Sequence, residues 1–493
     1  MGFSKFLTYG RLLRLNRMRF SKSVLLSSLL LLASVLSATQ SQTQLPDTPA
    51  GRQCAAWLEI FNRGDREAYR TFIEKNYPSA LKDMDRDMQF RQMTGGFDFR
   101  KLEDSAPTKI SLLVQERDSD QFARLDLQVE EAEPHRITSL DLRAIPRPAG
   151  QTEFQLPHLS LTELVAAART EIEKQVAADH FSGAVLVVKD GKPVLSEADG
   201  FADREHKIPN TLRTRFRIGS MNKMFTAVAT LQLAQAGKLG LQDPIGKYLI
   251  DYPNKDVATK ATIHHLLTHT GGTGDIFGPE YEAHRLELRT LADYIKLYGK
   301  RDLEFEPGTR WEYSNYGFVL LGAIIEKVSG QSYYDYVREH IYVPAGMTST
   351  GSEPENQAVP DRSIGYMRGP EGWKPNADTL PYRGTSAGGG YSTVEDLVRF
   401  ASAIEENKLL NADYTKLLTT GKPGTPDNSY AYGFGDRNVN GTRCFGHGGG
   451  APGMNGDLKI CPAVGYVVAV LANMDPPAAS RISDFISNRL PEH

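Results

Sequence analysis

The sequence has few cysteines and lacks the short motifs that mark nucleotide and metal chemistry. Its 493 residues include only three cysteines, too few for a disulfide scaffold. It contains no Gly-rich phosphate loop, no Cys-x-x-Cys pair and no His-Glu-x-x-His motif. We therefore expect no cofactor and no bound metal ion.

The apolar run over residues 24–38 is too short to cross a bilayer as a helix. It has about 15 residues, whereas a membrane-spanning helix needs roughly 20. Six basic and no acidic side chains precede it, which is typical of an export signal. We expect residues 1–38 to be a signal peptide, cleaved near Ser37 or Ala38, and the mature protein to be periplasmic or secreted. The alternative is an uncleaved membrane anchor.

The expected mature chain also lacks an excess of positive charge. The formal charge of the whole sequence is −3, and removing the six basic side chains of residues 1–38 makes it −9. A surface of this sign does not favour phosphate backbones. We expect no nucleic-acid partner.

What is present suggests two folded domains, because 493 residues with 40% hydrophobic side chains exceed a single core. Residues 51–147 combine one helical pattern with alternating strand patterns and predict a small α+β domain; the helix is expected over 55–77 and the strands over 109–114, 122–129 and 137–142. Residues 148–158, within a Pro-rich stretch, predict a linker. Residues 159–493 would form the second domain.

Strand patterns lie at both ends of the second domain. Residues 182–199 form two apolar runs around Lys189-Asp190-Gly191-Lys192, a hairpin signature. Further strands are expected over 444–447, 457–460 and 466–471, before a last helix over 477–489. Strands at both ends of a helical middle predict one sheet built from distant segments.

Cys444 and Cys461 flank a Gly-rich turn between two of these strands. If the strands pair antiparallel, the two sulfurs can meet in a disulfide. The alternative is a pair of small buried hydrophobes. The sequence alone leaves both open.

Ser220 and Lys223 stand at the start of a strongly apolar helical segment, residues 216–239. At positions i and i+3 their side chains share one face, so the amine can receive the hydroxyl proton. A serine hydroxyl needs such an adjacent base to become a nucleophile. A lone Ser-x-x-Lys is weak evidence, since Ser79 and Lys82 form one in a polar segment of the first domain.

Two further elements follow in the chain. Tyr313-Ser314-Asn315 opens an apolar helix, where a phenol can pass protons and an amide can hold a substrate carbonyl; a plain capping loop is the alternative. Tyr252-Pro253-Asn254 repeats the Tyr-x-Asn pattern in a turn. His447-Gly448-Gly449-Gly450 has glycines where a sheet edge could line a cleft, although most Gly-rich turns are only turns.

The ordered set Ser-x-x-Lys, Tyr-x-Asn and His-x-Gly resembles the serine beta-lactamase and penicillin-binding-protein superfamily, in its class C beta-lactamase-like and esterase branch. The resemblance covers about residues 161–491. It implies an α+β (α/β sandwich) fold: a mixed domain with an antiparallel sheet, flanking helices and a separate helical lobe, with the active site between sheet and lobe.

The resemblance also implies roles for individual residues. Ser220 would be the acylated nucleophile, Lys223 its proton acceptor and Tyr313 a general base and acid. Asn315, His447 and Gly449 would contact substrate. The backbone N–H groups of Ser220 and Gly450 would form the oxyanion hole.

The sequence departs from the family pattern at His447, where true class C lactamases and many carboxypeptidases carry a lysine. A neutral histidine suits esters, amides or lactones without an essential carboxylate. The expected function is therefore an exported serine hydrolase of ester, amide or D-amino-acid peptide bonds, with a small molecule or peptide as substrate. The alternatives are a non-catalytic binding protein that keeps the fold, and a cell-wall D,D-peptidase or beta-lactamase.

The first domain, residues 51–147, resembles the cone-shaped fold of the nuclear transport factor two and SnoaL-like superfamily in its order of elements. Members of that family bind small ligands or mediate dimers. The resemblance implies a homodimer formed through this domain as one possible assembly.

Overall fold

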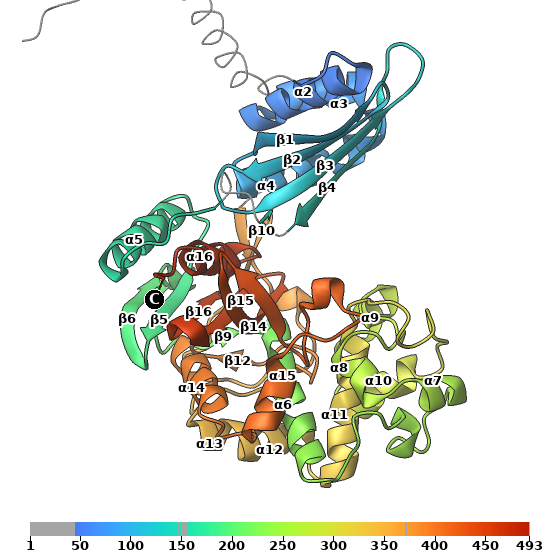
Figure 1. The fold of residues 1–493 in the computed structure, drawn as a ribbon, viewed down its shortest axis with the longest axis vertical. Helices are drawn as coiled ribbons and strands as arrows, with labels where there is room; N and C mark the ends of the chain where they lie inside the picture. Colours follow the sequence, from blue (N-terminus) through green and yellow to red (C-terminus); the bar gives the residue numbers. More distant parts are fainter. Residues whose placement is uncertain (1–44, 146, 149–154, 370–371, 493) are drawn as a thin grey trace, which may run out of the picture. The chain divides into compact units, whose positions relative to one another are not determined.

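The structure is a computed structural model that describes residues 45–145, 147–148, 155–369 and 372–492 (Figure 1). It divides into two compact units. The first contains the described residues up to Met84, with Gly96–Gln115 and Ala123–Ile145, and the second contains Asp85–Gly95, Glu116–Phe122 and the described residues from 147 onward. The expected signal peptide, residues 1–38, lies outside the described residues, as does part of the expected linker.

The first unit contains two helices where the sequence predicts one. Helices α2 (Pro49–Arg63) and α3 (Arg66–Asn76) are separated by Gly64, which adopts the left-handed conformation (φ 70°), and by Asp65, which caps α3. The single helix expected over residues 55–77 is therefore wrong, because a C-capping glycine followed by an N-capping aspartate ends one helix and starts another. A 3₁₀ helix, η1 (Pro78–Asp83), follows in this unit. Helix α4 (Met84–Thr94) comes next in the chain and, apart from Met84, belongs to the second unit.

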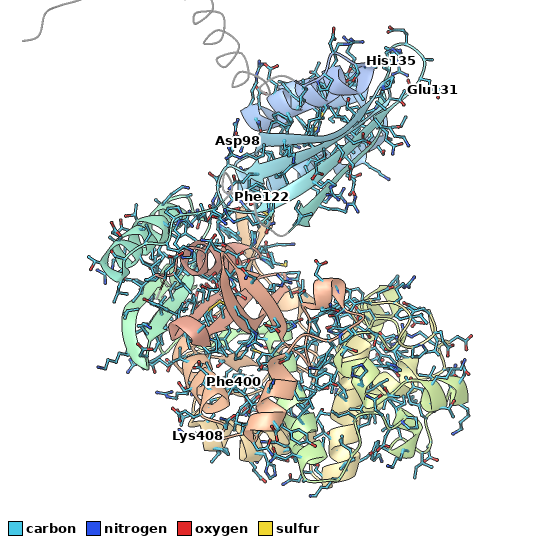
Figure 2. All side chains as sticks on the ribbon, in the orientation of Figure 1. Asp98, Phe122, Glu131, His135, Phe400 and Lys408 are labelled. Carbon is cyan, nitrogen blue, oxygen red and sulfur yellow. A yellow bond between two sulfur atoms is a disulfide. The ribbon has the colours of Figure 1, made fainter. Side chains whose placement is uncertain are left out.

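Four strands follow in the order β1-β2-β3-β4. They are β1 (Phe97–Ala106), β2 (Lys109–Glu116), β3 (Phe122–Val129) and β4 (Ile137–Ile145). Strands β2 to β4 match the three predicted strands, whereas β1 was missed because most of its residues are exposed and its apolar alternation stops after Phe99. Figure 2 shows Glu131 and His135 at the loop between β3 and β4.

Aromatic packing holds the helices of this unit to its sheet. Trp57 and Phe61 stack with ring centroids 4.6 Å apart, and Phe61 also meets Tyr69 at 5.9 Å and Phe97 of β1 at 6.0 Å. All four side chains are buried. The resemblance to the cone-shaped SnoaL-like fold stays a prediction.

The second unit is built on a six-stranded sheet of order β13-β14-β15-β16-β5-β6, antiparallel at every pairing. Its strands are β13 (Gly435–Val439), β14 (Thr442–Ala451), β15 (Met454–Cys461), β16 (Tyr466–Ala472), β5 (Gly183–Lys189) and β6 (Lys192–Asp199). The N-terminal hairpin thus pairs with the C-terminal strands, which confirms the sheet of distant segments. The central strands β5 and β16 are buried on both faces and read as continuous apolar runs.

Helices cover both faces of this sheet (Figure 1). Val185 and Val187 of β5 pack with α5 (Leu161–Ala177) and α16 (Ala478–Ser487), while Ala184 and Leu186 point to the other face, among residues of α6 (Asn222–Gln235) and α14 (Val394–Glu405). Phe400 of α14 is fully buried there, and Lys408 beyond its end is exposed (Figure 2).

A helical lobe lies between α6 and α14 in sequence. It comprises α7 (Lys255–Lys260), α8 (Ile263–Leu267), α9 (Pro279–His284), α10 (Leu291–Tyr298), α11 (Asn315–Ser329) and α12 (Tyr333–Val337). The remaining elements are β7 (Phe201–Asp203), β8 (Ile208–Pro209), β9 (Phe216–Arg217), η3 (Gly219–Met221), η4 (Ile245–Lys247), η5 (Arg338–Tyr342), α13 (Val343–Ala345), β10 (Tyr366–Gly369), β11 (Gly372–Pro375), η6 (Ala377–Thr379), β12 (Tyr391–Ser392), α15 (Ala412–Thr419), η7 (Pro426–Asn428) and η8 (Pro462–Val464). None of the described helices is both long and apolar enough to cross a membrane.

Cys444 and Cys461 form a disulfide across β14 and β15, with their Cα atoms 4.2 Å apart. The two strands pair in the register Phe445 to Ile460, which brings the neighbouring cysteines opposite one another. The disulfide hypothesis is confirmed. Cys54 is a free, buried thiol in the first unit.

Candidate active site

Ser220 and Lys223 meet where the short 3₁₀ helix η3 runs into α6. The 3₁₀ turn carries Ser220, and α6 carries Lys223 one turn later. The Lys223 Nζ lies 3.3 Å from the Ser220 Oγ. Helix α6 is buried on all sides rather than on one stripe, which explains its continuous apolar sequence.

Lys223 is fully buried and has no carboxylate within ion-pair distance among the described residues. Its Nζ donates to the Asn315 Oδ1 at 2.7 Å and to the Ala387 carbonyl at 2.5 Å. Burial lowers the pKa of Lys223 to about 7, against the attraction of Asp275, which raises it. A large fraction of this amine is therefore neutral near pH 7 and can accept a proton.

Tyr313 presents its ring to the same amine. The Lys223 Nζ lies 4.7 Å from the centre of that ring. Burial raises the pKa of Tyr313 above its usual value, although a hydrogen bond with Ser220 acts in the opposite direction. The structure thus brings Ser220, Lys223, Tyr313 and Asn315 together, and the phenol is protonated at neutral pH.

Residues 313–315, before α11, have both roles considered in the sequence analysis: they cap the helix and they belong to the candidate site. Ser314 is the N-cap of α11: its Oγ accepts from the Gly317 N–H at 2.9 Å and donates to the Gly274 carbonyl at 2.5 Å. The capping loop and the candidate site are therefore one structure, because the cap fixes the residues on either side of it.

Asp275 orients Asn315 and was missed by the sequence analysis. Its carboxylate accepts from the Asn315 backbone N–H at 2.9 Å and from the Asn315 Nδ2 at 3.1 Å. These two bonds leave the amide oxygen facing Lys223. The only sequence signal was its position directly after the Gly-rich turn of residues 271–274.

Gly449 allows β14 to approach the serine. A Cβ at this position would lie 1.9 Å from the Ile218 carbonyl oxygen, so no side chain fits. The neighbouring Gly450 and Ser220 both line one cavity of about 380 Å³. The expected oxyanion pair, the N–H groups of Ser220 and Gly450, therefore borders a common space.

This cavity, called the acyl cavity below, is mostly apolar. Its apolar lining residues are Ile276, Phe277, Tyr281, Tyr294, Leu380, Pro381, Ala387, Ala451, Pro452 and Met454. Its charged lining residues are Glu282, which is exposed, and Arg383, whose guanidinium lies over the Tyr334 ring. A neutral, apolar group fits these walls best.

His447 lines a second cavity, of about 360 Å³, together with Trp311 and Tyr313. Both of its ring nitrogens are bonded within the protein, Nε2 to the Tyr430 hydroxyl at 3.1 Å and Nδ1 to the Gly448 carbonyl at 2.5 Å. Burial by its neighbours and the charge of Lys223 lower the pKa of His447 to about 4. The imidazole is therefore neutral at physiological pH.

The two sequence look-alikes lie elsewhere. Ser79 and Lys82 belong to the 3₁₀ helix η1 of the first unit. Tyr252 is buried, with its hydroxyl 3.1 Å from that of Tyr316.

The Beta-lactamase family model matches residues 168–491. The chain therefore belongs to the beta-lactamase family, which confirms the resemblance to the superfamily of beta-lactamases and penicillin-binding proteins.

Individual relatives agree with this assignment. The chain is 34% identical over 258 residues to PbpX of Bacillus subtilis (strain 168), a match that covers 52% of this chain and 62% of that relative, less than two thirds of its length. The crystal structure of a penicillin binding protein from Bacillus halodurans is 33% identical, with a TM-score of 0.57, and covers 66% of this chain and 98% of its own. A D-stereospecific amidohydrolase from Streptomyces sp. is 27% identical, with a TM-score of 0.55 and coverage of 66% and 98%.

Proposed function

We propose that the protein is an exported hydrolase that cleaves ester, amide or D-amino-acid peptide bonds through an acyl-enzyme on Ser220. The observation that carries the proposal is the 3.3 Å approach of the Ser220 Oγ to the buried Lys223 amine, at a cavity bordered by the Gly450 backbone. A hydroxyl beside an amine that is partly neutral near pH 7 can be activated as a nucleophile.

In the acylation step, the Ser220 Oγ attacks the substrate carbonyl carbon and passes its proton to Lys223. The carbonyl oxygen becomes an oxyanion, which the N–H groups of Ser220 and Gly450 stabilise. The tetrahedral intermediate then collapses, and the leaving group takes a proton from the Tyr313 phenol, which regains one from the Lys223 ammonium. The net result is an acyl ester on Ser220 and a neutral leaving group.

In the deacylation step, a water molecule replaces the leaving group. It attacks the acyl ester while Tyr313 and Lys223 take its proton, and the Ser220 oxygen recovers a proton as the acid leaves. A phenolate is favoured only beside a cationic Lys223, because burial alone raises the pKa of Tyr313. The pair therefore acts as a unit in which one proton moves between two groups.

The walls of the acyl cavity and the state of His447 favour an uncharged, apolar acyl group. His447 has both nitrogens bonded and is neutral, so it supplies no fixed cation for a substrate carboxylate. This supports esterase-like or amidase-like activity above efficient beta-lactam hydrolysis. The similarity to a D-stereospecific amidohydrolase makes D-amino-acid amides the first amide substrates to test.

The test is covalent labelling of mature protein with a fluorophosphonate, followed by intact-mass spectrometry and peptide mapping. One adduct on Ser220, absent in Ser220→Ala, is expected. Full labelling of the Ser220→Ala protein would overturn the nucleophile assignment. No adduct on folded wild-type protein would favour a non-catalytic binding protein.

Substrate screening then separates the remaining alternatives. Hydrolysis of p-nitrophenyl esters or D-amino-acid amides supports the main proposal. Release of D-alanine from a muropeptide would instead identify a cell-wall D,D-peptidase, and rapid nitrocefin turnover a beta-lactamase.

Export through residues 1–38 and dimerisation through residues 51–147 are parts of the proposal that rest on sequence. N-terminal sequencing of protein recovered from the cell exterior or periplasm tests the first, with a new start near residue 38 or 39 expected. Light scattering of the full chain beside a variant lacking residues 51–147 tests the second.

A further inference from the structure

A chain of hydrogen bonds beside Tyr313 links Ser314, His269, Tyr430, His447 and Gly448. At the Ser314 end the donor is a backbone N–H group. The Ser314 N–H donates to the His269 Nδ1 at 3.1 Å. A backbone N–H can only donate, so Nδ1 must be the acceptor, and a neutral His269 carries its proton on Nε2. That Nε2 lies 3.0 Å from the Tyr430 hydroxyl oxygen.

The other end is defined by a backbone acceptor. The His447 Nδ1 lies 2.5 Å from the Gly448 carbonyl oxygen, which can only accept, so His447 carries its proton on Nδ1. Its bare Nε2 then accepts from the Tyr430 hydroxyl at 3.1 Å. Tyr430 thus accepts from His269 and donates to His447, and the directions required at the two ends agree.

Both histidines must be neutral for this arrangement to hold, and their surroundings favour that state. His269 is 1% exposed and His447 is half-buried. Burial and the charge of Lys223 lower the pKa of His269 well below its usual value and that of His447 to about 4. An imidazolium at either position would face a protonated Lys223.

The chain of bonds connects the parts that carry the catalytic groups. It begins at Ser314, between Tyr313 and Asn315, and ends on β14, next to Gly449. The His269 ring also contacts the Tyr313 ring at a tilt, with centroids 4.3 Å apart and planes at 34°. His269 adopts a positive φ of 60°, which is uncommon for a residue other than glycine and occurs where the surroundings enforce it.

We propose that Tyr430 is a positioning residue that holds His269 and His447 as opposite neutral tautomers, so that the Tyr313 ring and the Gly449–Gly450 edge of β14 stay fixed relative to Ser220. The kinetic part of this inference rests on the proposed hydrolase function, whereas the tautomers do not. In this proposal His447 has a structural role and does not contact the substrate, because both of its ring nitrogens are already hydrogen-bonded within the protein.

The tautomers are tested by ¹⁵N NMR of histidine-labelled mature protein at pH 7, without any substrate. His269 is expected as the Nε2–H form and His447 as the Nδ1–H form, each assigned by the resonances lost in His269→Gln and His447→Gln. In Tyr430→Phe at least one of the two rings should become a tautomer mixture. An imidazolium, or the reverse tautomer, at either position in the wild type would overturn the proposal.

The kinetic test compares Tyr430→Phe with Tyr432→Phe. Tyr432 is a matched control, because its hydroxyl also bonds a histidine, the His264 Nδ1 at 2.8 Å, and it lines neither of the two cavities. Tyr430→Phe is expected to lower kcat about 10- to 100-fold on an uncharged ester, by misplacing catalytic groups, with KM changed less than about twofold. Tyr432→Phe should keep kcat within about twofold of wild type.

The two inferences fail in different ways. Equal kcat values for Tyr430→Phe and Tyr432→Phe would overturn the positioning role, even if Ser220 is labelled as proposed. Absence of a Ser220 adduct in the wild type would overturn the hydrolase proposal, while the NMR result would still decide the tautomers.

Discussion

Two lysines of the second unit, the buried Lys223 and the half-buried Lys459, have opposite electrostatic environments. Lys459 of β15 pairs with Asp457 at 2.9 Å and with Asp484 at 2.5 Å. Burial lowers the pKa of Lys459, but the two carboxylates more than offset this and hold it above its usual value. Lys223 has only neutral partners within bonding distance, and its pKa falls to about 7. A paired lysine is a permanent cation, and an unpaired one can be a base.

Replacing Lys223 by methionine should have the largest effect. Removal of the base is expected to lower kcat/KM by about 10³- to 10⁴-fold. Unfolding free energy should nevertheless rise at pH 7, on the order of 4 kcal/mol, because the folded state holds this lysine at a pKa near 7 and the unfolded chain near 10.4. Activity assays and urea unfolding measure the two quantities.

The pH dependence of that stability difference follows from linkage. Between about pH 7 and 10 the unfolded chain binds the Lys223 proton more tightly, so wild-type stability rises with pH relative to Lys223→Met. Unfolding curves at pH 7, 8.5 and 10 should show the gap closing. A constant gap would mean that Lys223 is charged in the folded protein.

A displacement of β14 would disturb the oxyanion donors while leaving both lysines in place. Gly449→Ala is expected to lower kcat about 100-fold, because its Cβ would collide with the Ile218 carbonyl and move Gly450 away from Ser220. The control is Gly448→Ala, whose Cβ would meet Asp457 and Gly456 atoms only at 3.5 Å. The apparent pKa of the acid limb of kcat should stay unchanged in both variants, and a shift would show that the limb does not belong to Lys223.

Lys459→Met should act on stability and not on the chemistry. Losing the cation leaves Asp457 buried and unpaired, with an expected loss of about 3 kcal/mol in unfolding free energy. Thermal or urea unfolding measures it, and the acid limb of kcat/KM should keep its wild-type midpoint. A loss of activity as large as that of Lys223→Met would break the contrast between the two residues.

The smallest expected effect is a shift of the pH profile. On an uncharged ester, kcat/KM should fall about tenfold per pH unit below pH 7, where Lys223 becomes protonated. Asp275 raises the pKa of Lys223, so Asp275→Asn should move this limb to lower pH by less than about one unit. An unchanged or upward-shifted limb would contradict the electrostatic role of Asp275.

The sequence predicted those site residues that short-range geometry or the family pattern brings together. Ser220 and Lys223 are one helical turn apart, and Tyr313 with Asn315 follow in the expected order. Asp275, His269 and Tyr430 were not predicted, since they reach the site through bonds spanning 17 to 161 positions from irregular segments. No local periodicity encodes such contacts.

His447 and the first unit show two other limits. The motif was expected at a sheet edge, but His447 lies on β14, between β13 and β15 in the sheet. Its expected substrate contact depends on which atoms its nitrogens already bond, which only coordinates reveal. In the first unit, Gly64 and Asp65 are capping residues that indicate a helix break. The break was not predicted because the apolar spacing of a helix continues on both sides of them. Strand β1 was not predicted because charged side chains interrupt its apolar pattern.

The disulfide of β14 has a consequence for how this strand finds its partner. Four of the five residues from Gly446 to Gly450 are glycines, so few side chains are available to define the pairing, and such strands are prone to slip by one position. Cys444–Cys461 closes the ladder at one end, and the two-residue turn Pro452-Gly453 closes it at the other. A covalent link thus specifies an alignment that a nearly side-chain-free segment could not specify by itself.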